Sequence, residues 1–400
     1  MEIVKRICSF SVFVFILSGC ASLRHAVPPE LLSDARVFGM RDIRAFSGSP
    51  SDYFKKDLIK LFAQEEKVSP SGVSFNDDRT YNVLAVSGGA ANGAYGAGLL
   101  NGWSQSGRRP VFKVVTGIST GAIIAPIAFL GSKYDATLKE FYTKYSTKHI
   151  ARIHIPFTNS FANMRPLERL IGRYFDAELL KKIAVEYNKG RRLYVGTTNL
   201  DAQRLVVWDM GKIASLGDDL ALKLFRKIIL ASASMPIAFP PVYLKVEVDD
   251  KTYDEMHVDG GVTRQVFFLY DVLQGFDKAF QEKGRDASRT KYTIYVIRNG
   301  YVDPFYKEVR DKLSAIAERA VDTMINAQSI GDLYQLYVFA KDGGRGDFNL
   351  AYIPATHVSN AKEFFDPVEM QALFDLGFKE ASEGYPWRKS PPGLGEGEKR

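Results

Sequence analysis

The sequence predicts a three-layer α/β/α fold in which helices cover both faces of a mainly parallel central sheet. Residues 81–89 read as a buried strand that ends in glycines, and residues 90–107 follow as a helix of small residues. The same order recurs, with a β-branched strand over 112–119 and an apolar helix over 120–131. Short turns from strand to helix are typical of parallel sheets. With 400 residues, 46% of them apolar and 25% charged, the chain can build a sizeable core.

The N-terminus has the features of a secretory signal peptide. Lys5 and Arg6 precede an apolar run over about 7–17, which is too short to span a membrane. The run leads into Leu-Ser-Gly-Cys, which resembles the lipobox of bacterial lipoproteins and implies cleavage before Cys20 and diacylglyceryl attachment to its thiol. An ordinary signal peptide, or a buried helix with a chance cysteine, is the alternative. Because Cys8 lies inside the signal, we expect no disulfide and no cysteine-based metal site in the mature chain.

Composition divides the chain into four parts. Residues 1–19 are the expected signal peptide. Residues 20–80 are the expected lipidated N-terminus, tether and lead-in, because turn-forming clusters surround short helical stretches such as 52–67. Residues 81–385 form the main domain. The tail, 386–400, is rich in proline, glycine and charge, a composition typical of disorder.

Strands and helices alternate through the rest of the main domain. Strands are expected at 191–200, 204–210, 243–250, 255–261, 291–300 and 347–354. Helices are expected at 165–176, 177–188 and 217–234, as one or two helices within 303–344, and at 367–383, where Asp366 is the expected N-cap.

Ser119 stands in a Gly-x-Ser-x-Gly frame where the strand 112–119 gives way to a helix. A serine at such a turn is a candidate nucleophile, because its hydroxyl projects at the carboxyl end of the sheet beside a helix N-terminus. Gly117 and Gly121 suit a nucleophile elbow, one letting the chain bend and the other letting helix and strand approach. The structural alternative is a tight turn with a capping serine.

A second glycine-rich segment, 87–98, follows the neighbouring strand. Gly88, Gly89 and Ala90 leave backbone N–H groups uncovered at a helix N-terminus, where they form a candidate oxyanion hole. A phosphate-cradling loop or simple close packing is the alternative. The segment has neither the P-loop pattern nor the full dinucleotide-binding glycine pattern, which disfavours a nucleotide site.

Asp259 lies near the end of the strand 255–261, just before two glycines. In the same crevice as Ser119, its carboxylate is a candidate base, since an Asp near its reference pKa is ionised at pH 7. The alternative is a turn or N-cap residue. His257 lies two residues earlier, on the same face of a strand, so a triad that includes it stays open. No cofactor is expected, and no histidine spacing indicates zinc.

These three elements, in this order, resemble the patatin-like phospholipase family, which uses a Ser–Asp dyad. The resemblance covers roughly residues 80–300 and includes a small-residue segment, 231–242, that ends in prolines before the aspartate block. It implies a patatin-like fold, a catalytic domain over 81–385, and Ser119 and Asp259 as the catalytic pair.

The glycine block departs from the family pattern at two positions. Ala90 stands where the family normally has a third glycine, and it keeps its N–H. Asn92 stands where the family normally has Arg or Lys, so the loop loses a positive charge but keeps a neutral donor. This departure weakens the expectation of a strict preference for phospholipids over neutral esters.

The predicted function is that of a membrane-anchored serine hydrolase, a phospholipase or esterase acting on lipids or other carboxylic esters. Aromatic segments at 155–164 and 264–273 are candidates to line an acyl groove, or are plain core. Lys and Arg are scattered despite the net charge of +7, so no nucleic-acid partner is expected.

Two other functions stay open: a lipid-binding or envelope-assembly lipoprotein with weak or no catalysis, and acyl transfer to an alcohol. The expected location is the bacterial cell envelope, facing the periplasm or the cell surface. Ala21 after the lipidated Cys20 favours the outer membrane by resemblance to lipoprotein sorting.

Overall fold

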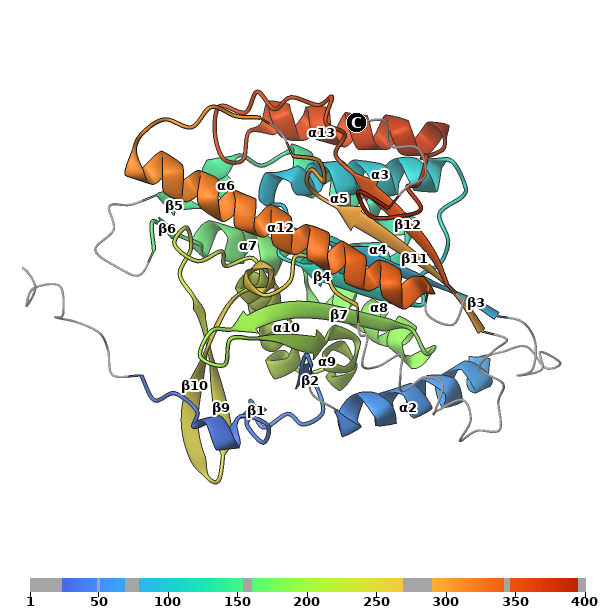
Figure 1. Ribbon diagram of the computed structural model, residues 1–400. Helices are drawn as coiled ribbons and strands as arrows, with labels where there is room; N and C mark the ends of the chain where they lie inside the picture. Colours follow the sequence, from blue (N-terminus) through green and yellow to red (C-terminus); the bar gives the residue numbers. More distant parts are fainter. Residues whose placement is uncertain are drawn as a thin grey trace, which may run out of the picture.

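The chain is organised around one mixed β-sheet flanked by helices (Figure 1). A computed structural model describes residues 24–48, 51–68, 79–153, 160–268, 290–304, 306–341 and 346–394. Within these ranges ten strands form the main sheet, and two short strands, β5 (Arg152–Ile153) and β6 (Ala162–Asn163), form a separate pair. The predicted three-layer α/β/α fold is confirmed, but the sheet is mixed and not mainly parallel as predicted, because hairpin-connected strands add an antiparallel half.

Five parallel strands make the centre of the sheet. Their spatial order is β7 (Arg192–Asn199), β4 (Val114–Ile118), β3 (Arg79–Val86), β11 (Thr290–Arg298) and β12 (Gly346–Tyr352). Every neighbouring pair in this series is parallel. The carboxyl ends of parallel strands lie at the same edge of a sheet, so the loops after β3, β4 and β11 converge there.

The other half of the sheet is antiparallel. It consists of β8 (Arg204–Asp209), β10 (Lys251–Asp259), β9 (Val242–Val248), β1 (Arg36–Val37) and β2 (Arg44–Phe46). Strand β10 pairs with β7 only over its last three residues, which set Asp259 opposite Thr197. The end of β10 is thereby brought back to the edge where the parallel strands end.

The helices form two layers, because the strands are apolar on both faces. In β3, Leu84 and Val86 belong to one buried cluster, whereas Val83 and Ala85 belong to the other. The first face is covered by α3 (Gly93–Gln105), α4 (Thr120–Leu130), α5 (Asp135–Thr143), α7 (Arg165–Tyr174), α8 (Ala177–Asn188), α9 (Met210–Leu216), α10 (Asp219–Ser232) and α13 (Pro367–Glu383). The second face is covered by α2 (Asp52–Val68) and α12 (Leu313–Lys341), and Figure 1 shows α12 lying across the sheet.

The glycines of α3 allow close packing between helices. A Cβ atom at Gly98 or Gly102 would overlap the backbone of α13, at Phe374 and Phe378. Figure 1 shows α3 and α13 side by side. Gly96 faces Ile297 of β11 in the sheet. Gly98 and Gly102 serve a helix pair formed with the C-terminal part of the chain.

Residues 24–48 and 51–68 pack with the domain, which differs from the predicted tether and lead-in before residue 81. Arg36 pairs with Glu247 in the sheet, and Arg44 pairs with Trp208. Helix α2 adds a buried ion pair between Asp57 and Arg192. Hydrogen bonds to strands far along the chain hold this segment in place, and turn-rich local composition does not reveal such partners.

The predicted signal peptide, 1–19, and Cys20 lie outside the described residues. No helix in the ranges that the structure describes is long and apolar enough to cross a membrane.

The predicted disordered tail is wrong for residues 386–394. Trp387 packs its ring 4.8 Å from that of Trp103 and 5.1 Å from that of Tyr295. Arg388 exchanges backbone hydrogen bonds with Leu350 of β12. Burial of the Trp387 ring outweighs the local preference of the surrounding proline and glycine residues for disorder. Residues 395–400 lie outside the described part of the chain.

Candidate active site

Ser119 occupies a strained turn between β4 and α4. Its backbone has φ 55° and ψ −122°, a region that costs a residue with a side chain about 1–3 kcal/mol. The turn is held by Ser232, whose hydroxyl accepts from the Ser119 N–H at 2.9 Å and donates to the Gly196 carbonyl at 2.7 Å. The side chain of Ser119 is thereby presented at the edge where the parallel strands end.

Gly117 and Gly121 make this turn possible. A Cβ at Gly117 would overlap the backbone of Gly121, and a Cβ at Gly121 would overlap the backbone of Val86 in the neighbouring strand. Neither position has room for a side chain. Both glycines thus lie where a nucleophile elbow requires them.

Asp259 lies against Ser119 at the end of β10. It is 6% exposed, its Oδ1 accepts from the Gly261 N–H at 2.7 Å, and the Ser119 side chain lies close enough to lower its pKa. Burial raises its pKa to about 7, although the Ser119 and Gly261 donors oppose this shift. Among the described residues no Lys, Arg or His forms an ion pair with it. Ser119 is the side chain that acts on the pKa of this carboxylate.

The glycine-rich loop after β3 lies on the other side of Ser119. A Cβ built on Gly88 would be 3.2 Å from the Ser119 Cβ, so the loop backbone touches the serine. Gly89 has φ 154°, and Ala90 has φ 49°. These two residues open the short helix η2 (Ala90–Asn92), where N–H groups have no partner in the preceding turn.

The three predicted oxyanion donors are not equivalent. Gly88 donates its N–H to the Gln265 carbonyl at 3.1 Å. The N–H groups of Gly89 and Ala90 donate to no group in the described part of the chain. The conformation therefore leaves two open donors beside Ser119 in place of the predicted three.

Two residues that the sequence analysis did not single out hold this loop in place. Gln265 accepts from Gly88 and donates from its side chain to the Gly261 carbonyl at 2.8 Å, so it joins the glycine loop to the aspartate loop. Asn299, directly after β11, donates from its side chain to the Ser87 carbonyl at 3.0 Å and accepts from Gly96 at 3.1 Å. The only sequence signal for Asn299 was its place near the end of the predicted strand 291–300.

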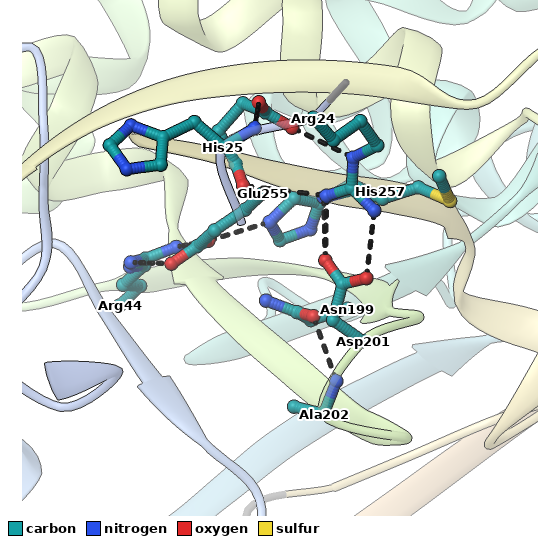
Figure 2. A network of polar contacts seen from close by, with 10 residues as sticks. Arg24, His25, Arg44, Asn199, Asp201, Ala202, Glu255 and His257 are labelled. Carbon is teal, nitrogen blue, oxygen red and sulfur yellow. Dashed lines mark hydrogen bonds and ion pairs between the residues drawn. The ribbon is translucent and has the colours of Figure 1, made fainter. Parts of the chain in front are cut away.

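His257 takes no part in this site. It is fully buried; its Nε2 lies 2.9 Å from Glu255 (Figure 2), and its Nδ1 lies 2.9 Å from Thr197. The Thr197 hydroxyl also accepts from Trp208 at 2.8 Å. Glu255 is a carboxylate paired with Arg44, so it can only accept, and Nε2 carries the proton. Burial lowers the pKa of His257, although Glu255 opposes the shift, so the ring is neutral and both nitrogens are committed.

The other predicted features of this region divide between core and surface. Val266 and Phe267, from the aromatic segment 264–273, are buried in the core. Phe161, from the aromatic segment 155–164, is 50% exposed. Residues 154–159 and 269–273 lie outside the described ranges. Within those ranges no cluster of three or more His, Cys, Asp or Glu is arranged to hold a metal ion.

A family model matches the part of the chain that carries this site. Residues 84–271 match the family model for Patatin, described as patatin-like phospholipase. No curated protein matches the chain by sequence. Among solved structures, the chain is similar to VipD from Legionella pneumophila, with 12% identity and a TM-score of 0.32, over 75% of this chain and 67% of that one. The matched range contains the glycine loop, Ser119 and Asp259, so residues 84–271 are a patatin-like phospholipase domain.

Proposed function

We propose that this protein is a serine lipid-acyl hydrolase that cleaves carboxylic esters with Ser119 as nucleophile and Asp259 as base. The family supports lipid acyl hydrolysis in general. The observation that carries the finer proposal is the place of the buried Asp259 carboxylate beside the Ser119 side chain, which lowers the pKa of that carboxylate. A carboxylate that has no cationic partner and a pKa near 7 is matched to proton transfer at neutral pH.

The reaction follows from these positions. Ser119 Oγ attacks the ester carbonyl carbon while Asp259 takes the hydroxyl proton. The resulting oxyanion accepts hydrogen bonds from the Gly89 and Ala90 N–H groups. The C–O bond of the ester then breaks, and Asp259 returns the proton to the departing alkoxide. Water attacks the acyl–Ser119 ester with Asp259 again as base, and this step releases the carboxylic acid and free Ser119.

The substrate is a lipid ester presented at a membrane, and the protein reaches it through a lipid on Cys20. Arg24, the first described residue, is bound to Asp201 and Asp254 at 2.8 Å each (Figure 2). The four residues from Cys20 to Arg24 span at most about 14 Å. A lipidated Cys20 would therefore hold this side of the domain close to the surface of a bacterial envelope membrane, and the sorting signal favours the outer membrane.

A fluorophosphonate probe, which reacts with activated serines, tests the nucleophile directly. We expect the purified full-length protein to be labelled at Ser119 and to release fatty acid from phospholipid, lysophospholipid or short neutral esters. Ser119→Ala removes both signals. Ser382→Ala, at a half-buried serine of α13, is the matched control and keeps both.

The alternatives give different outcomes in the same assay. A folded wild-type protein that is neither labelled nor active is a lipid-binding module, and the hydrolase proposal is then wrong. Labelling with transfer of the acyl group to an added alcohol, in place of free fatty acid, identifies an acyltransferase that uses the same serine.

A further inference from the structure

Arg298 is a buried cation next to the glycine loop. It ends β11, the parallel neighbour of β3, and is 6% exposed. No carboxylate of the described residues lies within ion-pair distance, and its Nε has no hydrogen-bond partner there. Burial lowers its pKa to about 10, although Asp332 opposes the shift, so it remains charged at neutral pH. Burying an unpaired charge is costly, which suggests that this charge has a use.

The hydrogen bonds of Arg298 converge on one peptide group. Its Nη1 donates to the Gly88 carbonyl oxygen at 3.2 Å and to the Ser87 hydroxyl at 3.3 Å. The Ser87 hydroxyl itself donates to the Gly88 carbonyl at 2.7 Å and accepts from the Asn299 N–H at 2.9 Å. The Gly88 carbonyl therefore accepts two donors, and one of them is charged.

The other end of that peptide group is the N–H of Gly89. The peptide is planar, so fixing the direction of the Gly88 carbonyl also fixes the direction of the Gly89 N–H. A cation at the carbonyl oxygen draws electron density away from the nitrogen and makes the N–H a stronger donor. In this way Arg298 acts on an N–H that is open beside Ser119.

We propose that Arg298 is a positioning residue of the oxyanion hole, which orients and polarises the Gly88–Gly89 peptide for the developing negative charge. This inference rests on the proposed hydrolase function. Arg298 also places a positive charge on the buried side of the glycine loop. Asn92, within the loop, carries no charge. Arg298 makes this contribution through the peptide and does not touch the substrate.

Gly300 makes room for the guanidinium. A Cβ at Gly300 would lie 3.0 Å from Arg298 Cζ and 3.1 Å from both terminal nitrogens. These atoms belong to the end of a flexible side chain, so Gly300→Ala displaces the guanidinium without removing its charge. This substitution provides a second way to weaken the bond to Gly88.

Three variants of the full-length protein test the proposal: Arg298→Met, Arg298→Lys and Gly300→Ala. The readouts are kcat and KM for a soluble ester, Ki for an alkyl boronic acid, which forms a tetrahedral adduct with an active serine, and the midpoint of thermal unfolding. Arg226→Met is the matched control, because Arg226 also donates to two backbone carbonyls, Phe175 at 2.8 Å and Gly172 at 2.9 Å, away from the site.

For Arg298→Met we expect kcat to fall at least about tenfold with KM within about threefold. Removing an oxyanion donor lowers kcat by about 10²–10³-fold, and weakening one should cost less. The boronate Ki should rise by a similar factor. Arg298→Lys should recover part of both values, Gly300→Ala should show a smaller loss of the same kind, and Arg226→Met should leave both near the wild-type values.

Wild-type kcat and boronate Ki in a folded Arg298→Met variant would overturn the inference while leaving the hydrolase intact. If that variant does not fold, Gly300→Ala decides, and an unchanged kcat overturns the inference. An inactive, unlabelled wild-type protein marks instead the failure of the proposed function itself.

Discussion

Strand β10 carries two buried carboxylates, Glu255 and Asp259, four residues apart, and their surroundings differ sharply. Burial raises the pKa of Glu255, but Arg44 and His257 outweigh it and bring the value down to about 2. Burial also raises the pKa of Asp259, and there only neutral donors, Ser119 and Gly261, oppose it, so the value rises to about 7.

The difference separates a structural carboxylate from a chemical one. Glu255 is ionised at every working pH and joins the N-terminal segment to the sheet through Arg44, whose Nη2 lies 2.8 Å from it. Asp259 can gain or lose a proton near neutral pH and lies beside a partly exposed serine. A cationic partner thus decides which of two buried acids on one strand is available for catalysis.

The largest expected effect comes from removing the catalytic pair. Ser119→Ala and Asp259→Asn should each lower kcat by about 10⁴-fold, because either change stops transfer of the serine proton. The measurement is fatty acid release from an ester substrate. Glu255→Gln, the same carboxylate-to-amide change on the same strand, is the control and should retain activity per folded molecule. Equal losses of kcat from Glu255→Gln and Asp259→Asn in folded protein would show that the two carboxylates do not differ in their role in catalysis.

Breaking the structural pair should act on stability. Arg44→Met leaves Glu255 buried without its cation and should lower the free energy of unfolding by about 3–5 kcal/mol. Urea unfolding measures the change. The specific activity of the folded fraction should stay within about twofold of wild type, because neither residue touches Ser119.

The control for that change is the double variant Arg44→Met with Glu255→Leu. Removing both charges should recover part of the lost stability. A loss below about 1 kcal/mol in Arg44→Met would show that the pair contributes little and that Glu255 tolerates burial alone.

The pH dependence of activity should report Asp259. Only the ionised carboxylate can accept the serine proton, so kcat/KM should rise with pH, reach half its plateau near pH 7, and fall about tenfold per pH unit below that. A series of rates from pH 5 to pH 9 on a neutral ester measures this. A flat profile down to pH 5 would mean that Asp259 keeps an ordinary pKa.

Stability should vary with pH in opposite directions at the two carboxylates. The folded pKa of Asp259, about 7, lies above its unfolded value near 3.9, so the folded state holds the proton longer and unfolding free energy falls as pH rises between those values. Glu255, with a folded pKa of about 2, contributes stability above its unfolded value near 4.3, and this is lost as pH falls toward 2.

The local sequence pattern predicted the elements that depend on residues close in sequence. The two strand–helix units before residue 131, the turn at Ser119 and the N-cap at Asp366 all follow from residues that are close in sequence. The Asp366 carboxylate accepts from the N–H groups of Val368 and Glu369, as an N-cap does.

The features that the sequence did not predict depend on partners far along the chain. Residues 24–46 enter the sheet through strands some 160 to 210 residues away. The Gly88 N–H is taken up by Gln265, and the guanidinium of Arg298 reaches the same glycine. Periodicity and turn composition describe a segment by itself, so they cannot say which distant strand or carbonyl will meet it.

The smallest effect on catalysis should come from His257, the residue that a conventional triad would require. Its two nitrogens already serve Glu255 and Thr197, and glutamine offers a donor and an acceptor of its own. His257→Gln should therefore cost about 1–2 kcal/mol of unfolding free energy. It should leave kcat within about twofold, measured beside Asp259→Asn on the same ester. If a folded His257→Gln protein loses activity as fully as Asp259→Asn, the catalytic base belongs to the network of His257 and Glu255 and not to Asp259 alone. The contrast between Glu255 and Asp259 would then not hold.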